Sequence, residues 1–159
     1  MADPTDNQPR APGQRVFSGL IPHMDVLGME TVEAKDGVAV IRLPWRPELV
    51  GNPENGVLHG GVVTTLIDTV SGLAAITGLA QPEPVATLDL RIDHLKPATP
   101  RQDLYARAEC YRLTRRIAFV RATAYQADPQ DLVASSVSTF MLTKRLGPIA
   151  TVMPTDKTS

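Results

Sequence analysis

The chain has 159 residues and a mass of 17.2 kDa, which is the size of one domain and leaves no room for a second full one. Its formal net charge is -1 and 21% of its residues are charged, so it lacks the basic excess typical of nucleic-acid-binding proteins. The single cysteine, Cys110, excludes an intrachain disulfide and a metal site built from cysteines. We therefore expect a cytoplasmic protein of one domain that binds no nucleic acid.

Both ends of the chain are expected to lie outside the folded unit. Residues 1–14 are rich in Pro, Asp, Asn and Gln and have no apolar run, which indicates a disordered leader rather than a secretory signal. Residues 146–159 contain two prolines and no periodic pattern, which predicts a flexible tail. The domain then covers residues 15–145.

The first half of the domain leads into one long helix. A short helix is expected over residues 16–27, interrupted near Pro22, and Asp36-Gly37 predicts a tight hairpin between strands at 29–35 and 38–43. Residues 45–61 are dense in Pro, Gly and Asn and have no regular period, so we expect a shaped loop. This loop delivers the chain to a helix over residues 60–78.

The second half of the domain is predicted to be sheet. Four segments alternate between apolar and polar residues and are bounded by turn residues, at 85–95, 103–113, 117–127 and 132–144. Their short connections favour antiparallel neighbours. The fold class is therefore α+β, one long helix with an antiparallel sheet of about six strands.

The long helix carries a carboxylate in unusual surroundings. A helical wheel places Asp68 on a half with Thr64, Thr65, Ser71 and Gly72, and this half has none of the Lys, Arg, Glu or Gln residues that solvate an exposed face. The helix has too many glycines and hydroxyl residues to span a lipid bilayer. Two interpretations of Asp68 remain: it is satisfied by neighbouring hydroxyl groups, or it takes part in chemistry.

The start of this helix offers a place for a developing negative charge. His59-Gly60-Gly61 follows a glycine-rich loop, and the unpaired N–H groups of a first helical turn can hold an anionic oxygen. His59 has no Ser or Cys partner at a suitable spacing, which favours a structural and typically buried histidine over an activator of a nucleophile.

Three runs of sequence resemble a known enzyme family. GNPENGVLHGGVVTTLIDTVSGLAA, VATLDLRIDHLKPA and TRRIAFVRATAYQ are similar to the hotdog-fold acyl-CoA thioesterases, specifically the PaaI-like branch of the 4-hydroxybenzoyl-CoA thioesterase superfamily. The resemblance implies a hotdog fold, in which an antiparallel sheet wraps a long central helix. It implies hydrolysis of an aryl or alkyl acyl-CoA to free acid and CoA, with no metal and no organic cofactor.

The resemblance also assigns roles to individual residues. The N–H of Gly60, after His59 of the family motif, would polarise the thioester carbonyl, and Asp68 would act as nucleophile or general base. Asn52 or Asn55 would occupy a family asparagine beside the thioester, with Asn52 favoured because Pro53 follows it. Thr87 would help to place water.

Strict strand alternation, however, puts Thr87 on the same face as Asp89 and Arg91, so its role requires a twist or bulge in the strand.

Three further residues have expected but competing roles. Arg115 and Arg116 precede a strand where relatives carry basic residues near the nucleotide, so they either hold the phosphates of CoA or are solvated surface. His94 stands where relatives are expected to have Tyr or Phe, and it either lines the acyl pocket or caps a strand.

Two other functions compete with hydrolysis, a hotdog-fold enoyl-CoA hydratase and a non-catalytic acyl-CoA-binding dimer.

Helix geometry makes a separate point about assembly. Gly60 and Asp68 are eight residues apart, or roughly 12 Å along a helix, whereas reacting atoms must approach within roughly 3.5 Å. If both act on one thioester, Asp68 must come from a second chain. We therefore expect a homodimer with two shared sites, an arrangement that the resemblance also implies and extends to a tetramer.

Overall fold

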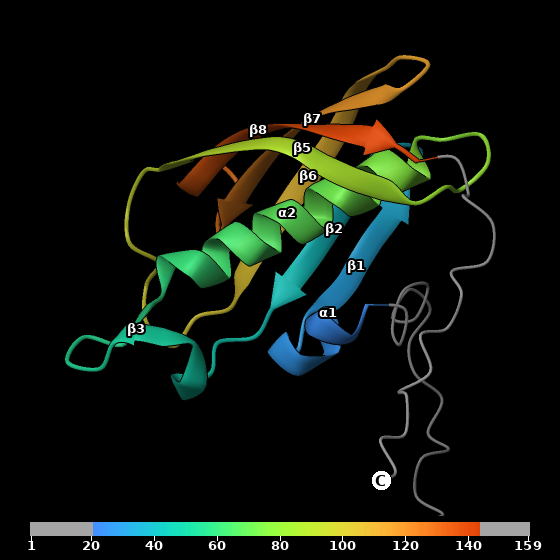
Figure 1. The fold of residues 1–159 in the computed structure, drawn as a ribbon. Coiled ribbons are helices and arrows are strands. Elements are labelled where there is room, and N and C mark those ends of the chain that lie inside the picture. The colour runs from blue at the N-terminus through green and yellow to red at the C-terminus, as the bar shows by residue number, and fades with distance from the viewer. Residues whose placement is uncertain (1–20, 144–159) are drawn as a thin grey trace, which may run out of the picture.

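A six-stranded antiparallel sheet curls around one long helix in the computed structural model, which describes residues 21–143 (Figure 1). The strand order in this sheet is β1-β2-β6-β7-β8-β5. The predicted α+β fold, a long central helix wrapped by an antiparallel sheet, is confirmed. The expected leader at 1–14 and tail at 146–159 lie outside the described residues.

The described part contains two helices and eight strands, of which the long helix and the six strands of the main sheet follow the predicted segments closely. The helices are α1 (Pro22–Leu27) and α2 (Gly60–Thr77). The main sheet consists of β1 (Glu30–Lys35), β2 (Val38–Leu43), β5 (Val85–His94), β6 (Leu104–Leu113), β7 (Ile117–Tyr125) and β8 (Leu132–Leu142). A short 3-10 helix, Pro47–Leu49, precedes a small hairpin of β3 (Val50–Asn52) and β4 (Val57–Leu58). Asp36 and Gly37 both have positive φ, 51° and 78°, as the predicted tight turn requires.

Pro22 begins α1, at a position where a proline loses no hydrogen bond, and residues 16–20 of the expected short helix lie outside the described residues. Two predictions about elements were wrong. The segment expected to be an irregular loop contains the β3–β4 hairpin. Finally, β5 pairs with β8 and not with β6, its neighbour in sequence, because the connection over residues 95–103 crosses to the other side of the sheet.

The interior is built from small side chains, which lets the sheet approach α2 closely. The inward faces of β6 and β7 are lined by fully buried alanines with a leucine and a valine: Leu104, Ala106, Ala108, Ala118, Val120, Ala122 and Ala124. Opposite them, Leu66, Ile67 and Val70 of α2 are completely buried. By length and composition α2 could cross a membrane, but here it is the core helix of the domain.

An ion-pair cluster ties the sheet to the segment that enters the β3–β4 hairpin. Arg42 of β2 contacts Glu30 at 2.6 Å and Asp103 at 2.7 Å. The other oxygen of Asp103 accepts the backbone N–H of Trp45 at 3.0 Å, and the indole N–H of Trp45 donates to the carbonyl of Gly56 at 3.2 Å. The Trp45 N–H, followed by Arg42, lowers the pKa of Asp103, and both carboxylates raise the pKa of Arg42.

This lowered pKa predicts how stability changes with pH. Because the folded protein favours the charged form of Asp103, its contribution is present at neutral pH and is lost as the pH falls below about 4. Asp103→Asn should therefore lower the free energy of unfolding at pH 7 by about 1.5–3 kcal/mol, the range for hydrogen bonds to charged groups. Urea unfolding of both proteins at pH 7 and pH 3 tests this: the difference should shrink at pH 3, and an equal difference at both pH values would contradict it.

Candidate active site

The first turn of α2 is capped by His59. The Nδ1 atom of His59 accepts the N–H of Gly61 at 2.9 Å, and its carbonyl accepts the N–H of Val62 at 2.9 Å. The structural interpretation of His59 fits this contact, but the expectation that it is buried was wrong, because its side chain is exposed. The N–H of Gly60 is left without an acceptor among residues 21–143.

The β3–β4 hairpin packs tightly on this turn, beyond the N-terminal end of α2 (Figure 1). A Cβ atom on Gly51 would lie 2.9 Å from the Cα of His59, so only glycine allows this approach. Gly51 was not among the site residues predicted from the sequence. The signal for it was a glycine directly before Asn52-Pro53, in a loop already marked as shaped.

Both candidate asparagines hold turns in this hairpin. The Oδ1 atom of Asn52 accepts the N–H of Glu54 at 3.0 Å, and that of Asn55 accepts the N–H of Val57 at 3.1 Å. Both side chains are exposed. Only Asn52 directly follows Gly51, the residue in contact with His59, and this proximity favours Asn52 at the helix start.

Asp68 is held from the neighbouring strand. The hydroxyl of Thr87 donates to its Oδ1 atom at 2.9 Å. The helix's own hydroxyls of Thr64 and Thr65 instead donate to the carbonyls of Gly60 and Gly61. Asp68 is half-buried, and its Oδ2 atom has no hydrogen-bond partner in the described part of the chain.

A β-bulge brings Thr87 to this position. The pairing of β5 with β8 shifts between Thr87 and Asp89, which leaves Leu88 as the extra residue, 51% exposed. Thr87 therefore turns toward α2. The role predicted for Thr87 required such a twist or bulge in the strand.

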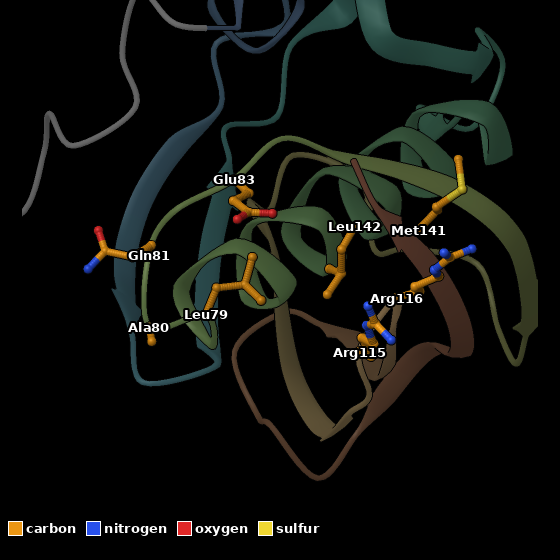
Figure 2. A pocket seen from close by; sticks show the side chains of 8 residues that line it. All are labelled: Leu79, Ala80, Gln81, Glu83, Arg115, Arg116, Met141 and Leu142. Carbon is orange, nitrogen blue, oxygen red and sulfur yellow. The ribbon is translucent and has the colours of Figure 1, made fainter. Parts of the chain in front are cut away.

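Arg115 and Arg116 line a cavity of about 620 Å³ near the C-terminal end of α2 (Figure 2). Its other lining residues are Leu79, Ala80, Gln81, Glu83, Met141 and Leu142. Both arginines are exposed, and neither forms a salt bridge within residues 21–143. Within the described part of the chain, the cavity thus offers two positive charges that have no ion-pair partner, beside the carboxylate of Glu83.

The predicted site residues form two groups in the structure, one at the start of α2 and one further along this helix. His59 and Gly60 share the helix start with His94, whose Cε1 atom would be 3.8 Å from a Cβ on Gly60. Asp68 and Thr87 meet further along α2. Eight residues, roughly 12 Å of helix, separate Gly60 from Asp68 within one chain.

This combination of helix, sheet and helix-start motif defines a family. Residues 55–133 match the family model described as the thioesterase superfamily. A solved structure of a protein from that superfamily is 31% identical, covers 80% of this chain and 93% of its own, and has a TM-score of 0.72. The chain belongs to the thioesterase superfamily and has the hotdog fold.

Individual relatives agree with this placement. A protein of solved structure from Pseudomonas aeruginosa is 43% identical, with a TM-score of 0.73 over 80% of this chain and 94% of its own. The medium/long-chain acyl-CoA thioesterase YigI of Escherichia coli is 27% identical over 80% of this chain and 89% of its own. A protein of Halobacterium salinarum that carries the name of an esterase is 40% identical over 57% of this chain, but the match spans only 60% of that protein.

The hydrogen bond from Thr87 should matter for thioester hydrolysis. Thr87→Val keeps the shape of the side chain but removes the donor, so Asp68 should lose its fixed orientation and turnover should fall about tenfold. Thr77→Val is the matched control, because the Thr77 hydroxyl bonds only to the carbonyl of Ala74 within α2. Initial rates with an acyl-CoA ester test the prediction, and equal rates for both variants would show that the bond has no role.

Proposed function

We propose that the protein is an acyl-CoA thioesterase, which hydrolyses an acyl-CoA to free acid and CoA. The observation that carries this proposal is the Asp68 carboxylate, half-buried on a helix face of small residues and oriented by Thr87. The names of relatives such as YigI support the activity. The acyl group itself is left open between aryl and alkyl.

The proposed reaction uses two groups, the N–H of Gly60 and the carboxylate of Asp68. The free N–H of Gly60, at the positive end of the α2 dipole, stabilises the oxyanion that forms on the thioester oxygen. Asp68 either attacks the carbonyl carbon itself or takes a proton from water that attacks it. In the first route the C–S bond breaks as the acyl group moves to Asp68, and water then hydrolyses the acyl–aspartate anhydride and regenerates the carboxylate. In the second route water adds to the carbonyl carbon and the C–S bond breaks. Both routes consume one water molecule, and the thiolate of CoA takes up a proton. Neither route needs a metal or an organic cofactor.

We propose that a second chain completes each site. The separation of roughly 12 Å between Gly60 and Asp68 cannot be closed by one aspartate side chain. Strand β5 supports the pairing, because it is an edge strand of ten residues that lies along α2, and no strand of residues 21–143 pairs with its outer edge (Figure 1). Two chains joined there would set their α2 helices antiparallel, with Gly60 of one near Asp68 of the other. Association of two such dimers gives the tetramer that the family resemblance implies.

The cavity at Arg115 and Arg116 is proposed as the site of the CoA phosphates. It lies past Thr77 at the end of α2, about 13 Å along the helix from Asp68. The flexible arm of CoA would bridge this distance from the thioester sulfur. The fork of an arginine side chain suits phosphate, and two unpaired forks give the charge that such an anion needs.

We also propose a cytoplasmic location, without membrane or nucleic-acid partners. The support is the charge balance and Cys110 as the only cysteine. Burial raises the pKa of the Cys110 thiol, so little of the reactive thiolate is present at neutral pH.

The role of Asp68 is tested by Asp68→Asn, with Asp128→Asn in an exposed turn as the control for the same chemical change. If Asp68 acts as nucleophile or base, its variant should fold and assemble like the wild type but release CoA at least about a hundredfold more slowly. A thiol reagent detects the free CoA, which an enoyl-CoA hydratase or a binding protein would not release. Unchanged turnover in Asp68→Asn would contradict the assignment.

The phosphate site is tested by replacing Arg115 and Arg116 together with Ala. The KM for acyl-CoA should rise and depend less on salt, whereas hydrolysis of an acyl-pantetheine, which lacks the nucleotide, should hardly change. Replacing Arg107 and Arg121 on the outer face of the sheet removes the same charge and is the control. Equal losses on both substrates would mean that the two arginines act through structure.

A further inference from the structure

The first turn of α2 has one N–H donor without an acceptor in residues 21–143, whereas an oxyanion site commonly combines two donors. The N–H of Gly61 is taken by the His59 side chain and the N–H of Val62 by the His59 carbonyl, each at 2.9 Å. Of the three N–H groups of Gly60, Gly61 and Val62, only that of Gly60 has no acceptor among the described residues. A thioester oxygen placed on it would therefore have room for a second donor, which can be a backbone N–H or a side chain such as histidine.

The side chain of His94 lies beside Gly60. The Cε1 atom of His94 is the one atom within 4 Å of a Cβ built on Gly60, at 3.8 Å, apart from its chain neighbours and its own helix backbone. Cε1 is bonded to both ring nitrogens, so the polar edge of the imidazole lies close to Gly60. The His94 side chain is exposed, and neither ring nitrogen has a hydrogen-bond partner within residues 21–143.

Strand β5 explains why His94 reaches the helix start. The bulge at Leu88 puts Thr87, Leu90, Ile92 and His94 on the side that faces α2. The same strand thus brings one polar side chain to Asp68 and another to Gly60. Because β5 and α2 belong to one chain, His94 accompanies the Gly60 of its own subunit.

We propose that His94 is a catalytic residue that donates a hydrogen bond from a ring N–H to the thioester carbonyl oxygen held by the N–H of Gly60. The oxyanion then has two donors, one from the backbone of α2 and one from the end of β5. This role rests on the proposed thioesterase function. In this role His94 does more than line the acyl pocket or cap a strand.

The test compares His94→Phe, which keeps a flat ring but has no donor, with His94→Gln, which restores an N–H. Using an acyl-CoA that the wild type hydrolyses, kcat of His94→Phe should fall roughly a hundredfold while KM stays within about twofold. His94→Gln should recover at least about a tenth of the wild-type kcat. His23→Phe, at an exposed position on α1, is the control, and all variants should unfold at the wild-type temperature.

Several outcomes would overturn the proposal. A wild-type kcat in His94→Phe, or a His94→Gln variant as slow as His94→Phe, would exclude a donor role. A change in KM alone would show that His94 lines the acyl pocket. In each case an active wild type leaves the thioesterase function intact, whereas a wild type that releases no CoA from any ester would contradict that function and the donor role with it.

Discussion

The rise of an α-helix governs how this site can work. The free N–H of Gly60 and the carboxylate of Asp68 are separated by eight residues of α2, which a helix converts into roughly 12 Å. No rotamer of an aspartate closes that distance, and α2 cannot bend to do so, because its central residues are buried against the sheet. A mechanism that uses both groups on one thioester therefore needs two copies of the chain.

The rest of the molecule is consistent with this requirement. Alanine faces on β6 and β7 let the sheet close on one side of α2, while the side with Gly60, Thr64 and Asp68 carries only small residues that a second helix could approach. Strand β5 contributes in two ways. Its outer edge is unpaired within residues 21–143 and so could take a second chain, and through its bulge β5 holds Thr87 on Asp68 and His94 beside Gly60.

Local chemistry explains what could be predicted from the sequence. The Asp36-Gly37 turn, the helix from Gly60 and most strand limits depend on nearby residues, and the structure agrees with them. The pairing of β5 with β8 depends on contacts between distant segments, and no short-range pattern contains it. The bulge that turns Thr87 inward is likewise set by packing on α2. The close approach of Gly51 to His59 became evident only in three dimensions.

The most direct test of the shared site mixes two inactive proteins, Asp68→Ala and Gly60→Val, the second of which blocks the oxyanion donor by bulk. Refolded together, they should form heterodimers in which one site carries both changes and the other carries neither. With random pairing, activity should return to about a quarter of that of wild type refolded in the same way, since about half of the dimers are mixed and each has one intact site of two. Heterodimers confirmed by mass that remain inactive would contradict the shared site.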